Sequence, residues 1–244
     1  MKTVIIIPTY NEKDNVPKLV QAIQRQNAEV DILFVDDHSP DGTGAIADAL
    51  SKKNPHVHVL HRPGKDGLGR AYVAGFRWAL DRDYDNMMQM DADLSHDPTQ
   101  IPAFLEAIKD YDAVFGSRYS KGVRVYNWSF KRLLLSKFYN EFVRFFLRMD
   151  CTDTTTAYKC FRRKVLESLD WKLLRGPRNS FLIELVFYTV KKGFKTIEIP
   201  FMFIERESGE SKMSPSIGVE ALLTIFRLAL TRVKQTENIP TPAR

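Results

Sequence analysis

The chain has 244 residues, 44% of them hydrophobic, and a formal net charge of +6 at pH 7. This length suits one α/β domain with a substantial core. The positive charge predicts an anionic partner such as a nucleotide or a phospholipid surface. Nucleic acid is not the expected partner, because the sequence has neither a zinc-finger spacing nor an aromatic RNA-binding pattern. Cys151 and Cys160 fit no disulfide or metal-binding spacing, so we expect both to be packing residues in a reducing compartment.

The first part of the chain alternates between strand and helix patterns. Apolar, β-branched runs predict buried strands at residues 3–7, 32–35 and 57–60. Apolar residues at helical spacing predict helices at 14–26 and 44–52. The order βαβαβ is typical of parallel strands joined by right-handed crossovers. We therefore expect a Rossmann-like, mostly parallel sheet flanked by helices.

The next strand leads into an acidic segment. It follows a glycine-rich turn with a possible binding role and a helix predicted at 71–80. In an extended chain residues i, i+2 and i+4 point to one side, so Asp91, Asp93 and Ser95 are expected to line one edge of the sheet. Converging carboxylates repel unless a cation separates them, and Mg²⁺ or Mn²⁺ with phosphate oxygens in its open positions is the usual solution. The alternative is a solvated, Asp-rich turn.

Polar clusters follow three of the predicted strands, at residues 8–12, 36–37 and 91–95. In open α/β sheets, ligands bind beyond the carboxyl ends of the strands. We therefore expect these clusters to share one cleft.

Two later helices are the main features of the second half. The helix predicted at 128–147 is interpreted as a packed helix with a basic face, with a membrane-surface helix as the alternative. Its apolar stripe consists of Leu133, Leu134, Phe138, Phe142, Phe145 and Phe146. The last helix, at 217–233, is expected either to close the core or to lie on an anionic membrane or a partner helix. The other predicted elements are helices at 98–109, 164–169 and 180–190, strands at 113–115 and 196–203, and a polar loop at 205–215.

The expected location follows from two features. No stretch approaches the roughly 20 apolar residues of a membrane-spanning helix. The N-terminus runs directly into a strand-like segment, without the longer apolar region and cleavage site of a signal peptide. We expect a cytoplasmic protein, peripheral at the cytoplasmic face of a membrane.

Four motifs occur in order: Pro8-Thr9-Tyr10-Asn11-Glu12, Val35-Asp36-Asp37 with the residues through Thr43, Asp91-Ala92-Asp93, and Gly116-Ser117-Arg118-Tyr119. Together they resemble the inverting nucleotide-sugar glycosyltransferases of family 2, which have a GT-A fold. Within that family, residues 127–132 and 200–212 look like the dolichol-phosphate mannose synthases. The resemblance covers roughly residues 3–213. We expect a GT-A domain at 1–213, an amphipathic helix at 214–235 and a tail at 236–244.

The resemblance implies roles for individual residues. Asp91 and Asp93 would hold Mg²⁺ or Mn²⁺ at the donor diphosphate, with Ser95 as a third ligand where many members have Gln. Arg118 and Arg132 would grip the acceptor phosphate, and with Asp93 they are the expected catalytic residues. The donor nucleotide sugar would be held by Pro8, Tyr10, Glu12, Val35, Asp37, Asp91, Ala92, Asp93, Arg206 and Lys212.

The implied reaction is metal-dependent, inverting transfer of mannose from GDP-mannose to dolichyl or polyprenyl phosphate. The alternatives are UDP-glucose or another donor, a glycan hydroxyl as acceptor, or a non-catalytic nucleotide-sugar-binding or membrane-scaffolding module. Many relatives carry membrane-spanning helices after the catalytic domain. Here the C-terminal helix, or a separate membrane-anchoring subunit, would bring the chain to its lipid. Residues 154–159 also depart from the Thr-Ser-Gly-Phe-Arg common in the family, which changes the expected lining near the acceptor.

Overall fold

The computed structural model describes residues 1–174, 176, 179–205 and 215–233, with residue 179 and residues 215–221 described by their backbone alone. Arg206, Lys212 and the predicted tail at 236–244 lie outside the described residues.

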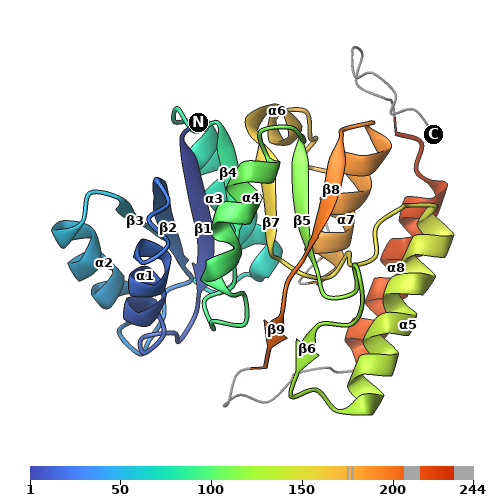
Figure 1. Ribbon diagram of the computed structural model, residues 1–244, viewed down its shortest axis with the longest axis horizontal. Helices are drawn as coiled ribbons and strands as arrows, with labels where there is room; N and C mark the ends of the chain where they lie inside the picture. The colour runs from blue at the N-terminus through green and yellow to red at the C-terminus, as the bar shows by residue number, and fades with distance from the viewer. Residues whose placement is uncertain (175, 177–178, 206–214, 234–244) are drawn as a thin grey trace.

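A seven-stranded sheet forms the centre of the molecule, with the order β3-β2-β1-β4-β7-β5-β8 (Figure 1). β7 runs antiparallel to both of its neighbours, β4 and β5, whereas the other strand pairs are parallel. The expected mostly parallel sheet is therefore confirmed. The strands are β1 (Thr3–Thr9), β2 (Val30–Asp36), β3 (Val57–His61), β4 (Asn86–Gln89), β5 (Ala113–Ser117), β7 (Lys159–Arg162) and β8 (Thr196–Pro200).

Helices cover both faces of the sheet, each over its own apolar cluster. One face carries α1 (Val16–Gln24), α2 (Thr43–Lys53) and α4 (Ile101–Ala107), which follows the short 3₁₀ helix η1 (Pro98–Gln100). The other carries α3 (Leu68–Leu80), α6 (Arg163–Glu167), α7 (Asn179–Lys191), α8 (Pro215–Leu230) and the end of α5 (Phe130–Leu147). A small parallel ribbon of β6 (Val125–Tyr126) and β9 (Phe203–Ile204) lies below β5 and β8 in Figure 1.

The packing of α3 on the sheet depends on a glycine. A Cβ atom at Gly75 would overlap the side chain of Ile6 on β1, so glycine allows the helix backbone to approach the strand closely. Both cysteines are buried and free, in agreement with the expected packing role.

The antiparallel strand β7 was missed by the sequence interpretation. Its residues form a short run that includes Lys159, and a charged residue does not suggest a central strand. Its partners are distant in the chain, since Gln89 of β4 pairs with Lys159. Local periodicity carries no information about such a pairing.

The interpretation of α5 as a packed helix was wrong for much of its apolar stripe. Leu134, Phe138 and Phe145 are 59%, 68% and 78% exposed, whereas Val143 and Leu147 face the core. The helix is apolar on two faces, and the periodicity of the sequence does not reveal which face has a partner.

The expectation that the last helix closes the core is confirmed for one side of α8, and contact of its other side with a membrane or a partner helix stays a prediction. Ile225 and Leu228 are buried in the core, while Leu223 and Leu230 are 65% and 86% exposed. Among the described residues, none of the helices combines the length and the apolar character needed to cross a membrane.

Candidate active site

A pocket of about 260 Å³ lies at the carboxyl ends of β1, β2 and β4. These strands end at the lower edge of the sheet in Figure 1. The three polar clusters that the sequence placed in one cleft do meet there. The start of α3 closes the pocket. The lining residues are Pro8, Thr9, Tyr10, Glu12, Asp37, Lys65, Gly67, Leu68, Ala71, Asp91, Ala92 and Asp93.

The acidic segment is a turn and not the extended run that the sequence interpretation assumed. β4 ends at Gln89, and Leu94 has a φ of 61°. The backbone N–H and the hydroxyl of Ser95 donate to Asp93 Oδ1 at 3.1 and 2.6 Å. Ser95 therefore holds Asp93 in place, and Asp91 and Asp93 both still line the pocket. Leu94 in the left-handed region gives no recognisable sequence signal, because that conformation is uncommon for leucine.

Asp91 is held by two aromatic side chains. The Tyr72 hydroxyl donates to Asp91 Oδ1 at 3.1 Å, and the Asp91 backbone N–H donates to His96 Nδ1 at 3.0 Å. The ring of His96 is 1% exposed and stacks on Tyr158 at 4.8 Å. Neither His96 nor Tyr72 was selected from the sequence.

The acidic pair is electrostatically unfavourable by itself. Burial raises the pKa of Asp91, and the charge of Asp93 adds to the rise, although His96 and the Tyr72 hydrogen bond oppose it. Two carboxylates beside a serine hydroxyl are oxygen donors of the type that Mg²⁺ and Mn²⁺ bind. Among the described residues, no group of three or more His, Cys, Asp or Glu side chains is placed to hold a metal alone. A cation here would need ligands from the substrate as well.

The side of the pocket formed by β1, β2 and the loop before α3 contains residues that the motifs did not indicate. Lys65 Nζ lies 3.8 Å from the centre of the Tyr10 ring. Arg62 donates to Asp37 Oδ1 at 2.5 Å, so the loop before α3 is attached to the end of β2. The glycine-rich turn was the signal for this loop. Val35 differs from the other expected donor residues among those described, because it is fully buried in the core and does not line the pocket.

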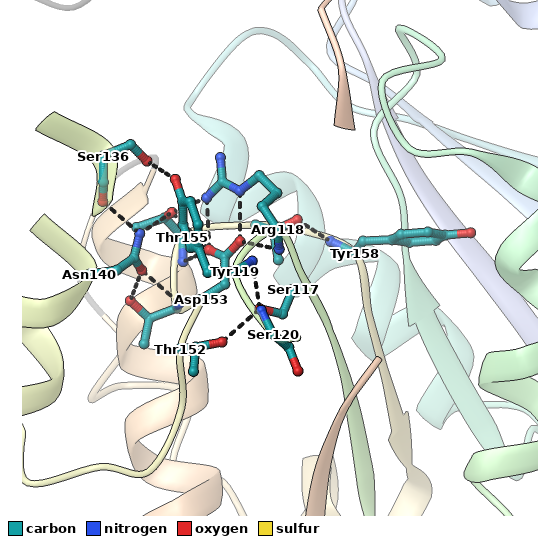
Figure 2. A network of polar contacts seen from close by, with 12 residues as sticks. Ser117, Arg118, Tyr119, Ser120, Ser136, Asn140, Thr152, Asp153, Thr155 and Tyr158 are labelled. Carbon is teal, nitrogen blue, oxygen red and sulfur yellow. Dashed lines mark hydrogen bonds and ion pairs between the residues drawn. The ribbon is translucent and has the colours of Figure 1, made fainter. Parts of the chain in front are cut away.

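Arg118 belongs to a buried polar network (Figure 2). Its Nε and Nη2 donate to the two carboxylate oxygens of Asp153 at 2.6 and 2.7 Å, and Nη2 also donates to Thr155 Oγ1 at 2.5 Å. Arg118 is 7% exposed and Asp153 is fully buried. Burial would lower the pKa of Arg118, but the Asp153 carboxylate outweighs this effect and raises it. Both groups are therefore charged.

The Asp153 loop is tied to two elements. Glu198 of β8 accepts from the backbone N–H groups of Thr152 and Asp153 at 2.9 and 3.0 Å. Asn140 of α5, which Figure 2 labels beside Asp153, accepts from the Thr154 N–H at 2.9 Å. These hydrogen bonds hold the backbone of the loop, and with it the Asp153 carboxylate, independently of Arg118. The sequence analysis identified residues 154–159 as a departure from the family pattern, but it did not identify the role of Asp153.

A buried lysine lies close to the same network. Lys159 is fully buried and donates from Nζ to the Thr156 carbonyl. Burial lowers its pKa to about 8, although the charges of Asp153 and Asp91 oppose the change. With a pKa of about 8 the ammonium group is still mainly charged at pH 7, and it interacts with the carboxylates of both Asp153 and Asp91.

Arg132 lies beside Arg118 and in a more open position. Its side chain is 32% exposed and forms an ion pair with Glu205, which follows β9. The guanidinium carbons of Arg132 and Arg118 lie 4.2 and 5.4 Å from the ring of Trp128. The structure thus brings the two expected acceptor arginines to one aromatic side chain.

A Rossmann-like sheet whose strand ends form a pocket with an acidic pair, together with two arginines near one another, is typical of nucleotide-sugar transferases of the GT-A class. Residues 4–170 match the family model described as glycosyl transferase family 2. The chain belongs to this family.

Relatives match along nearly the whole chain. An undecaprenyl-phosphate mannosyltransferase of Micrococcus luteus is 43% identical over 94% of this chain and 95% of its own length. A polyprenol monophosphomannose synthase of Mycolicibacterium smegmatis is 45% identical over 92% of this chain and 85% of its own. A dolichol-phosphate mannosyltransferase of Pyrococcus furiosus is 38% identical over 93% of this chain and 64% of its own.

Solved structures confirm the fold class. Glucosyl-3-phosphoglycerate synthase of Mycobacterium tuberculosis, in complex with Mn²⁺, UDP and glucosyl-3-phosphoglycerate, superposes with a TM-score of 0.68 over 93% of this chain and 80% of that one. The same enzyme with Mg²⁺ and UDP has a TM-score of 0.65. The sequence identities of 14% and 16% limit this similarity to the fold.

Proposed function

We propose that the protein transfers mannose from GDP-mannose to a polyprenyl phosphate, with inversion and with Mg²⁺ or Mn²⁺ as cofactor. The observation that carries the proposal is the 43% and 45% identity, along almost the whole chain, to relatives named for polyprenyl-phosphate mannose synthesis. The pocket residues and the two arginines agree with the proposal, because the pocket offers a place for the donor diphosphate and the arginines offer a place for the acceptor phosphate.

The donor would occupy the pocket at the strand ends. Tyr10, Glu12 and Asp37 would contact the nucleoside, and Asp91 and Asp93 would lie at the diphosphate; all five residues line the pocket, which supports this proposal. A bound Mg²⁺ or Mn²⁺ would neutralise charge on the departing nucleoside diphosphate. The protein would orient the two carboxylates that bind this metal. Ser95 holds Asp93, while Tyr72 and His96 hold Asp91. Arg206 and Lys212 remain proposed donor-phosphate ligands on the basis of the resemblance alone.

The acceptor phosphate would lie between Arg118 and Arg132. A phosphate monoester is already negatively charged at pH 7, so one of its oxygens can attack the sugar without a strong general base. Arg118 is held by Asp153 and keeps a fixed direction. Arg132 is the more exposed of the two, and its pairing with Glu205 can be exchanged for the lipid phosphate.

We also propose that α5 and α8 hold the protein on the membrane that contains the lipid. The two helices lie side by side at the end of the molecule away from α2 (Figure 1), and the rings of Phe146 and Phe226 are 5.8 Å apart. We call their exposed apolar side chains the apolar ridge: Phe130, Leu134, Leu135, Phe138, Phe145, Phe146, Leu222, Leu223, Phe226 and Leu230.

The ridge is suited to an anionic bilayer. Apolar side chains of this kind insert at the headgroup boundary, and the exposed Lys131 and Lys137 of α5 would meet anionic headgroups. Arg132 belongs to the first turn of the same helix. A lipid phosphate at the bilayer surface would therefore lie close to the proposed acceptor site.

Replacing Leu134 and Phe138 together by serine should weaken binding to vesicles with anionic lipid by about tenfold or more, because two exposed apolar side chains are removed from the bilayer contact. Vesicle co-sedimentation measures this. Leu173→Ser is the matched control, since Leu173 is also exposed, at 39%, but lies outside the ridge. Equal binding by the double variant and the control would refute the docking surface.

The reaction is tested by incubating the protein with a short-chain polyprenyl phosphate and either GDP-mannose or UDP-glucose. We expect mannosyl lipid from GDP-mannose, in the presence of Mg²⁺ or Mn²⁺ and not in the presence of a chelator. The non-phosphorylated polyprenol should give no product, because it offers the arginines no anion. Glucosyl lipid would replace the proposed donor, and product from the free alcohol would replace the proposed acceptor.

A further inference from the structure

The ring of Trp128 contacts both of the arginines that are proposed to bind the acceptor phosphate. The centre of its ring is 4.2 Å from the guanidinium carbon of Arg132 and 5.4 Å from that of Arg118. A guanidinium within about 6 Å of an indole face is attracted by the ring. One side chain therefore contacts both cations.

The position of this ring is set by the backbone on either side of it. Asn127 has a φ of 64°, and Ser129 caps α5 by accepting from the Arg132 backbone N–H at 3.4 Å. Tyr126, in β6, accepts from the Glu205 N–H at 3.4 Å. Trp128 is thus held between the ribbon and the helix independently of the guanidinium contacts.

Each guanidinium contacts the Trp128 ring and forms an ion pair with one carboxylate. Asp153 binds Arg118, and Glu205 pairs with Arg132. Two cations so close to one another repel, and the shared ring and the two acids offset that repulsion. This arrangement fixes the separation of the arginines before any ligand arrives.

Packing alone does not account for tryptophan at this position. Its Nε1 is shielded from solvent and has no hydrogen-bond acceptor among the described residues. An unpartnered buried N–H destabilises a fold, and phenylalanine would avoid that cost. Indole, however, binds cations more strongly than phenyl. The choice of side chain therefore agrees with cation binding better than with simple filling of space.

The ring is also connected to the acidic pair. Trp128 packs against Phe203 with ring centres 5.5 Å apart, and Phe203 contacts His96 at 6.2 Å. His96 accepts from the Asp91 N–H. The donor pocket and the two arginines thus share one set of aromatic contacts.

We propose that Trp128 is a positioning residue for the acceptor phosphate, whose ring fixes the spacing of Arg118 and Arg132 so that both guanidiniums face one phosphate group. The inference rests on the proposed function. Trp128 does not line the donor pocket described above, so its effect should fall on the acceptor and not on the nucleotide sugar.

The test compares Trp128→Leu with Trp128→Phe, which keeps an aromatic ring. Transfer is measured while a short polyprenyl phosphate and GDP-mannose are varied separately. We expect the KM for the lipid to rise about 10- to 30-fold in Trp128→Leu and about threefold in Trp128→Phe. The KM for GDP-mannose should stay within about twofold in both. Trp78→Leu is the matched control, because Arg82 lies 3.9 Å from the Trp78 ring at a site far along the sheet, and it should change neither constant.

Direct binding of the same lipid phosphate without donor separates this inference from the reaction itself. Weaker binding by Trp128→Leu, largely restored in Trp128→Phe, supports the positioning role even if the wild-type protein transfers no mannose to the lipid, a result that would refute the proposed function. Unchanged lipid binding and KM in Trp128→Leu would overturn the inference. So would equal losses for donor and acceptor, which indicate a general structural defect.

Discussion

Replacing Asp93 by asparagine is expected to lower kcat by at least about 10³-fold, because the metal at the donor diphosphate would lose one of its two charged ligands. The fold should survive. Asparagine keeps an oxygen that can accept from the Ser95 N–H and hydroxyl, as Asp93 Oδ1 does at 3.1 and 2.6 Å. The measurement is the rate at saturating GDP-mannose and lipid, together with the denaturant midpoint.

Asp97→Asn provides the matched control for this prediction. Asp97 is also a turn carboxylate, and its Oδ1 accepts from the Thr99 N–H at 2.9 Å, but it does not line the pocket. Its variant should keep nearly normal kcat. Metal-dependent activity of normal size in Asp93→Asn would refute the assignment of Asp93 as a ligand.

Replacing Arg118 by methionine should reduce the free energy of unfolding by about 3–5 kcal/mol, since it leaves the fully buried Asp153 without its cation. Asp153 is ionised in the native state. Burial raises its pKa, but the charge and hydrogen bonds of Arg118 outweigh this effect and lower it. Urea unfolding measures the loss of stability.

A double variant separates the structural and functional effects of Arg118. Arg118→Met with Asp153→Leu removes both charges and should recover most of the stability, because an apolar pair can replace a buried ion pair. It should not recover use of the lipid phosphate. A double variant with a normal KM for the lipid would show that Arg118 does not bind the acceptor.

The sequence was sufficient to predict the strands and helices of the first 80 residues. The buried apolar run before Pro8 and the one before Asp36 are continuous signals that periodicity detects directly. The polar residues that follow these strands line one pocket, because parallel strands end at the same edge of the sheet. These features depend on local pattern and on a general rule of topology.

Other features depend on contacts between distant residues and could not be predicted. The pairing of Lys159 with Gln89 places a charged residue in a central strand. Asp153 acquires its role from Arg118, which is 35 residues away in the chain. The exposed side of α5 has the same apolar pattern as a packed side. The sequence therefore cannot show that a residue such as Phe138 is exposed, and the structure is needed to show it.

The central claim is direct displacement of the nucleoside diphosphate by a lipid phosphate. It is tested most directly by supplying GDP-mannose with ¹³C in the sugar, together with polyprenyl phosphate and Mg²⁺ or Mn²⁺, and determining the anomeric configuration of the product by NMR. A single displacement predicts mannosyl phosphate lipid in the β configuration, opposite to that of the donor. Product in the α configuration, or mannose attached elsewhere than to the phosphate, would contradict it.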